Sequence, residues 1–230
     1  MNGRSIEYIH GMNKICLVFV LFYWLSSAHA QEVALLKYEG GGDWYANPTA
    51  LENLVDFYNE HQGGNIELAP KEITVDQLQE KAPAFVHATG HGRIYFSLEQ
   101  AAAVRQYLQR GGFLHLDDNY GMKEFAIEAM RAVFPDIEPV DLPGSHPVYH
   151  DPFAMPDGIP KIHEHDGEKP RALGYFYEGE LVALITMESD LGDGWEDPEV
   201  HNDSPEKREI ALKMGANLVH WSMLRNSSNP

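Results

Sequence analysis

Histidine and aspartate residues follow two apolar segments, and such residues can shuttle protons or hold a metal ion. The first segment ends in the tetrapeptide TGHG at residues 89–92, which contains His91, and the second ends in Asp117 and Asp118. A carboxylate beside an imidazole fixes its tautomer and raises its basicity, as a general base or a metal ligand requires. We therefore predict that His91 is a catalytic acid/base, and that Asp117 and Asp118 orient it or hold a divalent metal.

The same three residues also have a structural interpretation. Asp117 or Asp118 can cap the helix that follows Gly121, and His91 can be a turn residue between two glycines. Ligands of open α/β sheets bind beyond the carboxyl ends of the strands, where both segments stop. Both interpretations stay open, and the proximity of His91, Asp118 and His146 decides between them.

Histidines recur further along the chain, in the motifs HPVYHD (residues 146–151) and HEHD (residues 163–166). We predict His146 and His150 as metal ligands, because they lie in a long irregular stretch, and such stretches are often functional. His163 and His165 would share one face of an extended segment, but no third ligand follows at a diagnostic spacing. We therefore expect residues 163–166 to form a solvated loop.

An acidic, glycine-rich segment at residues 190–197 (DLGDGWED) lacks the spacing of a calcium-binding loop. We expect it to close one side of the site, with Asp190 facing inward and Trp195 either stacking on a sugar ring or packing in the core. Trp44 and Tyr45 follow a glycine run and would border the same crevice. These four residues are our predicted substrate-binding set. The chain has neither the Lys-Ser/Thr ending of a phosphate loop nor a G-x-S-x-G elbow.

Hydrophobic periodicity places these residues on an α/β scaffold. Apolar runs predict strands at 33–38, 66–68, 84–89 and 113–116, and capping residues predict helices that begin at Thr49, Thr74 and Ser97. A further helix covers roughly 122–133, and residues 171–177 and 181–187 form a hairpin. Ser204 and Pro205 start the last helix. Alternating strands and helices at this spacing predict a mostly parallel sheet.

The ends and the charge of the chain suggest where the protein acts. Residues 1–30 have the layout of a secretory signal peptide, with Lys14 before an apolar run and an Ala-His-Ala exit, although Met12 is an alternative start. Residues 31–230 then form a single domain without cysteine, since Cys16 lies in the leader. A formal charge of −18 repels phosphate backbones and anionic lipids, so we expect no nucleic-acid partner. After signal removal no integral membrane segment is expected.

Several ordered motifs together resemble a bacterial family, the domain of unknown function 4159. They are Gly90-His91-Gly92, Gly111-Gly112-Phe113, the pair Asp117-Asp118, His146-Pro147 and the segment from Asp190 to Glu196. The resemblance implies a class I glutamine amidotransferase-like fold, similar to the trehalose-utilisation-like group, which is a flavodoxin-like three-layer sandwich. The amidotransferases use a cysteine nucleophile, which residues 31–230 lack, so glutaminase activity is not implied.

Together these observations favour a secreted or periplasmic hydrolase that acts on a carbohydrate or another small polar molecule. A divalent metal is the candidate cofactor, and His146, His150 and Asp190 would complete the pocket. The alternative is a non-catalytic binding domain of the cell envelope, which would hold a glycan, a peptide or an envelope protein at the same crevice.

Overall fold

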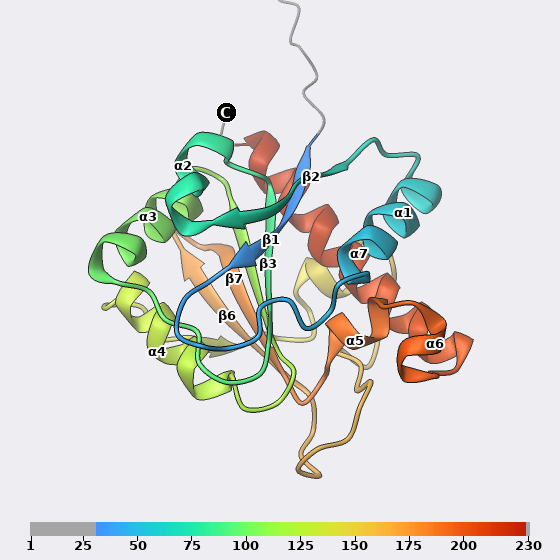
Figure 1. Cartoon of the computed structure of the whole chain (residues 1–230). Helices are drawn as coiled ribbons and strands as arrows, with labels where there is room; N and C mark the ends of the chain where they lie inside the picture. Colours follow the sequence, from blue (N-terminus) through green and yellow to red (C-terminus); the bar gives the residue numbers. More distant parts are fainter. Residues whose placement is uncertain (1–30, 229–230) are drawn as a thin grey trace, which may run out of the picture.

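A computed structural model describes residues 31–228, so the predicted signal peptide lies outside the described residues. One sheet of seven strands runs through the middle of the molecule in the order β2-β1-β3-β4-β7-β6-β5, and helices cover both of its faces (Figure 1). The strands are β1 (Glu32–Lys37), β2 (Glu67–Thr74), β3 (Phe85–Gly90), β4 (Phe113–Asp118), β5 (Val140–Asp141), β6 (Arg171–Tyr177) and β7 (Glu180–Met187).

The sheet is mostly parallel, as predicted. Strands β2, β1, β3, β4 and β7 are parallel to one another, whereas β6 pairs antiparallel with β7 and with the edge strand β5. The predicted hairpin is confirmed as β6 and β7. Strands β3 and β4 are direct neighbours, with Thr89 paired to Asp117 and Gly90 to Asp118. The two predicted polar strand ends therefore lie at the same edge of the sheet.

Two helical layers enclose the sheet and make an α/β three-layer sandwich. The helices are α1 (Ala50–Gln62), α2 (Leu78–Lys81), α3 (Leu98–Gln109), α4 (Lys123–Val133), α5 (Leu191–Trp195), α6 (Pro198–His201) and α7 (Pro205–Ser228), with short 3₁₀ turns η1 (Val75–Gln77) and η2 (Pro147–Tyr149). Residues of α1, α5 and α7 share one hydrophobic core, and residues of α2, α3 and α4 share the other. In the described part of the chain, no helix is both long and apolar enough to cross a bilayer.

Alternation along the strands explains both cores. Val33 and Leu35 of β1 face the α1/α7 core, while Ala34 and Leu36 face the α3/α4 core. The same alternation puts His87, Thr89, His115, Asp117 and Thr186 on the α1/α7 face near the carboxyl ends of their strands. The α1/α7 face of the sheet is therefore polar near the carboxyl ends of β3, β4 and β7.

Two segments differ from the expectation. Residues 188–203, for which the composition predicts a loop, contain the short helices α5 and α6, and strand β5 was not expected. Thr49 precedes α1 as predicted, yet its hydroxyl accepts the N–H of Asp197 (3.2 Å) instead of capping its own helix. The start of α1 is thereby tied to the segment that follows α5.

Candidate functional site

Seven imidazole and carboxylate side chains meet beyond the carboxyl ends of the parallel strands. We call this group the edge cluster: His163, His165, Asp190, Asp193, Glu196, His201 and Asp203. The first two come from the loop before β6, and the others come from the segment between β7 and α7. Asp190 directly precedes α5 with a φ of 57°, in the left-handed region, and so turns the chain sharply after β7. Such backbone outliers cluster at functional sites.

His163 is bonded to carboxylates through both ring nitrogens. Its Nδ1 lies 2.9 Å from Asp193 Oδ2 and 3.5 Å from Asp190 Oδ2, and its Nε2 lies 3.0 Å from Asp203 Oδ2. Hydrogen bonds to Asp190 and Asp193 raise the pKa of His163 to about 10. Without a bound cation the imidazole is therefore charged at neutral pH and offsets part of the surrounding negative charge; a metal ion on Nδ1 would replace that proton.

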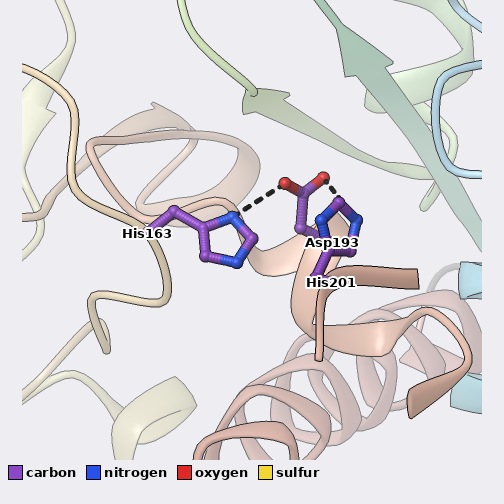
Figure 2. A group of neighbouring side chains, drawn as sticks. All are labelled: His163, Asp193 and His201. Carbon is purple, nitrogen blue, oxygen red and sulfur yellow. Dashed lines mark hydrogen bonds and ion pairs between the residues drawn. The ribbon is translucent and has the colours of Figure 1, made fainter. Parts of the chain in front are cut away.

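Asp193 stands between two imidazoles (Figure 2). One oxygen accepts from His163, and the other lies 3.8 Å from His201 Nε2. Burial alone would raise its pKa, but hydrogen bonds from His163 and Asn47 lower the pKa of Asp193 below its ordinary value. Asp193 is thus an ionised acceptor. One ligand atom from each of His163, Asp193 and His201 falls within 4.8 Å of the others, so these three residues could hold a metal ion.

His165 and Asp190 form a second pair in the edge cluster. Nε2 of His165 lies 2.5 Å from Asp190 Oδ2, and the imidazole ring stacks on Tyr120 with centroids 4.7 Å apart. The Asp190 side chain is 1% exposed, and its Oδ1 has no hydrogen-bond partner among the described residues. A buried carboxylate oxygen without a donor is unusual, since buried polar atoms are normally satisfied.

His201 pairs with a carboxylate in the same way. Its Nε2 lies 2.9 Å from Oε2 of Glu196, whose side chain is 3% exposed. Asn47, from the loop after β1, donates to Asp193 Oδ1 (2.6 Å) and reaches Glu196 Oε2 (3.5 Å). The side-chain amide of Asn119 donates to the same Asp193 oxygen (2.9 Å). The loops after β1 and β4 therefore orient Asp193 in α5, and the loop after β1 also contacts Glu196, which follows this helix.

A chain of buried polar groups lies beneath the edge cluster. Asp117 accepts from Thr186 Oγ1 (2.5 Å) and from the Gly192 N–H (2.6 Å). Thr186 in turn contacts His115 Nε2 (2.9 Å), and Nδ1 of His115 lies 3.0 Å from Nδ1 of His87. Burial lowers the pKa of His87 to about 3 and that of His115 well below its ordinary value, so this histidine pair is neutral.

The Asp117 carboxylate fixes helix α5 to the sheet. Burial, opposed by its two hydrogen bonds and reinforced by the charges of Asp190 and Asp193, raises the pKa of Asp117 to about 7. A Cβ on Gly192 would lie 2.9 Å from Asn47 Oδ1 and 3.2 Å from Asp117 Oδ2. Only glycine allows α5 to approach the strand ends this closely.

The predicted catalytic residues do not form one group. His91 is bonded to Asp43, through its backbone N–H (2.5 Å) and through Nδ1 (3.1 Å), and its side chain is 54% exposed. Asp118 accepts the backbone N–H groups of Tyr120 (3.2 Å) and Met122 (2.6 Å), so it caps the turn into α4. Asp117 faces the opposite side of the sheet and supports α5. Asp118 therefore has the capping role that the structural interpretation gave it. The carboxylate partner of His91 is Asp43 and neither Asp117 nor Asp118.

The predicted substrate-binding residues also differ from one another. Trp195 is fully buried, its indole N–H donates to the carbonyl of Ala211 (2.8 Å), and its ring packs 5.0 Å from that of His87. Of its two alternatives, core packing is the one observed, and a sugar cannot reach the ring. Tyr45 is exposed, and Trp44 is partly buried beneath Lys37. Asp190 faces inward, as expected.

The predicted metal ligands His146 and His150 lie away from the edge cluster. The ring of His146 packs against Phe176 and Trp221, and Trp221 donates to the carbonyl of Leu181 near the start of β7. The edge cluster lies beyond the other end of β7. The six residues of extended chain that follow Leu181 span about 20 Å, which separates His146 from the cluster. His146 accepts the Val148 N–H, and His150 contacts the Gly144 carbonyl. Local backbone groups thus engage both rings, and the structure does not bring His146 together with the edge cluster.

The histidines expected to form a solvated loop are the ones that join the cluster. His163 and His165 were set aside because no third ligand follows them at a diagnostic spacing, yet their partners lie 25 to 40 residues away in the chain. The usable signal was the acidic segment 190–203, which also contains His201. An HxH motif and an acid-rich segment that contains a histidine hold enough ligands for a site, but their sequence spacing does not show that the two segments are neighbours in the fold.

The fold and the site define an α/β protein with a mostly parallel sheet and a histidine–carboxylate cluster at the carboxyl edge. The family model described as Domain of unknown function (DUF4159) matches residues 32–223, and the chain therefore belongs to that family. No curated protein matches the chain.

Proposed function

We propose that this protein is a hydrolase for a small polar substrate such as a carbohydrate, and that the edge cluster is its reaction centre. The observation that carries the proposal is the pair formed by His165 and Asp190, whose atoms lie 2.5 Å apart within a group of further imidazoles and carboxylates. A carboxylate that holds an imidazole in this way fixes the orientation and the tautomer of the ring, and an imidazole so placed can remove a proton from water.

Burial distinguishes this pair from the one that contains His91. Asp190 is 1% exposed, whereas Asp43, the partner of His91, is 36% exposed. Water and salt screen exposed ion pairs, so Asp43 holds the ring of His91 less firmly than the buried Asp190 holds that of His165. His165 is therefore the acid/base group in this proposal. Asp190 orients it, and Asp117 keeps α5 in place.

The chemistry of the rim supports a neutral polar substrate. The imidazoles of His163, His165 and His201 are 23–28% exposed and can exchange hydrogen bonds with sugar hydroxyls. Asn47 and Asn119 are buried and already bonded to Asp193, so they orient the cluster from beneath. The excess of acidic groups disfavours phosphorylated or sulfated substrates. Tyr120, 49% exposed and already stacked on His165, offers an aromatic face at the same rim.

Two further expectations belong to this proposal. The parallel strands follow the order β2-β1-β3-β4-β7, which is the flavodoxin-like order, and this supports a class I glutamine amidotransferase-like fold. The signal-like residues 1–30 support a secreted or periplasmic location.

The hydrolase proposal is tested with chromogenic glycosides, acetylated sugars and amides as substrates. We expect His165→Ala to reduce kcat about 10²- to 10⁴-fold, the usual contribution of a general acid or base. His220→Ala is the matched control, because His220 has comparable exposure and also faces a carboxylate, Asp151, outside the edge cluster. Equal activity of the His165→Ala and wild-type proteins on every hydrolysed substrate would refute the role of His165.

The binding-domain alternative has its own support. Asp118 caps a turn and His91 is exposed, which is the arrangement expected of a module that only binds. Oligosaccharide binding measured by calorimetry, with no product released over hours, would favour this alternative over catalysis.

A further inference from the structure

We propose that His163, Asp193 and His201 bind a divalent transition-metal ion at the edge cluster. The proposal rests on the site described above, but it does not depend on hydrolase activity. The three residues come from separate segments, the loop before β6, helix α5 and the end of α6, and they direct ring nitrogens and a carboxylate toward a common point (Figure 2).

The distances suit a metal centre. Ligand atoms on one tetrahedral zinc ion are about 3.3 Å apart, since each lies about 2.0–2.1 Å from the metal. The His163 Nδ1 to Asp193 Oδ2 distance is 2.9 Å, and His201 Nε2 lies 3.8 Å from Asp193 Oδ1. These two distances join different oxygens of Asp193, and one ligand atom from each of the three residues lies within 4.8 Å of the others. A bound ion would therefore draw the side chains closer together by rotation.

Asp190 provides an independent indication that a cation binds here. Its side chain is buried, one oxygen lies 3.5 Å from the same His163 nitrogen, and the other oxygen is unpartnered. A cation at this position would satisfy that oxygen, because carboxylates coordinate metal ions directly. Asp190 is then the fourth ligand, or it orients a metal-bound water.

The surroundings of His163 also resemble a metal site. Asp203 lies 3.0 Å from Nε2, so this nitrogen can donate to Asp203 while Nδ1 faces the metal position. A metal-bound histidine commonly donates its other N–H to a carboxylate, which fixes the ring and raises its affinity for the metal.

The donor set selects the class of ion. Two imidazoles with one or two carboxylates suit Zn²⁺, Fe²⁺ or Mn²⁺, whereas Ca²⁺ and Mg²⁺ prefer oxygen donors alone. When bound, such an ion would lower the pKa of a coordinated water and supply a nucleophile beside His165.

The test is calorimetric titration of chelator-treated protein with ZnCl₂, and with CaCl₂ for comparison. We expect one zinc ion per chain, little calcium binding, and loss of zinc binding in His201→Ala and Asp193→Asn. Asp203→Asn should weaken zinc binding about 10- to 100-fold, as expected for an outer partner of a ligand. His220→Ala, with a side chain as exposed as that of His163, should bind zinc like the wild type.

Cobalt substitution provides a second readout that does not depend on affinity alone. Co²⁺ bound by nitrogen and oxygen ligands absorbs visible light, and His201→Ala should change this spectrum while circular dichroism shows an intact fold. Absence of zinc binding to the wild type, or zinc binding that survives in His201→Ala and Asp193→Asn, would overturn the metal site. Hydrolysis that persists in chelator without bound metal would leave the proposed function intact, and stoichiometric zinc without hydrolysis would leave only the metal site.

Discussion

Asp117 shows how one buried carboxyl can both position the site and respond to pH. It has no exposed surface, it accepts two hydrogen bonds, and it stands beneath the negative charges of Asp190 and Asp193. The donors stabilise its ionised form, while burial and repulsion favour its neutral form. The protonation of this single residue therefore affects how firmly α5 is attached to the sheet.

The pH dependence of stability should reveal this carboxyl. Its pKa is about 7 in the folded state and 3.8 when unperturbed, so between these values the folded state binds the extra proton. Stability should therefore fall as pH rises from 4 to 7, with Asp117 contributing up to about 1.4 kcal/mol per pH unit. Asp117→Asn should remove this contribution in urea unfolding experiments at successive pH values.

Asp43→Asn is the control for this pH experiment. Burial alone would raise the pKa of Asp43, but the His91 hydrogen bonds lower it, so Asp43 is ionised in both states between pH 4.5 and 7. This variant should keep the wild-type slope in that range. An unchanged slope in Asp117→Asn would show that Asp117 is ionised throughout the range.

At the scale of elements, helix α5 is the part on which the edge cluster depends. It is five residues long, too short to be stable alone, and it is held by Asp117 below and by Asn47 and Asn119 from two neighbouring loops. The backbone of α5 must approach the strand ends closely for these contacts to form, which explains the glycine at position 192.

A methyl group at Gly192 should displace α5. The added Cβ would lie 2.9 Å from Asn47 Oδ1 and 3.2 Å from Thr89 Oγ1, so we expect Gly192→Ala to lower the free energy of unfolding by about 1–3 kcal/mol. Gly144→Ala, where the added Cβ meets nothing within 4 Å, should change it by less than about 0.5 kcal/mol. Urea unfolding measures both, and equal stabilities would contradict close packing of α5.

Local patterns in the sequence predicted the elements well. The helix that begins after Ser97, the hairpin and the strand predicted at 113–116 are all observed, because each depends on residues close together in the chain. Helix α5 was missed because LGDGW contains two glycines and has little intrinsic helix propensity. Its helical conformation depends on tertiary contacts with distant loops.

At the scale of the whole molecule, the sheet topology locates the site but does not select its residues. From β1 the chain passes to β2 and then returns to β3 on the other side of β1, so the carboxyl ends of β1 and β3 are the switch point at which ligands of such sheets commonly bind. Asn47 and Thr89 lie there, buried and joined by a hydrogen bond of 2.8 Å. The sequence predicted this edge of the sheet as the position of the site.

The selection of residues depended on contacts that sequence spacing does not encode. His91 lies at the predicted edge, but the glycine run before Asp43 brings that carboxylate to it near the surface. His163 is brought to Asp193 and Asp203 only because the loop before β6 crosses the same edge as the segment after β7. The first segment is irregular and the second contains only helices of five and four residues, so hydrophobic periodicity carries no information about their meeting.

Anomalous X-ray diffraction from crystals grown with zinc tests the central claim most directly. The account predicts one strong zinc peak about 2.0–2.2 Å from His163 Nδ1, His201 Nε2 and an Asp193 oxygen, the coordination distance for such ligands. A peak at His146 and His150 instead, or no peak at the edge cluster with zinc in excess, would contradict the account.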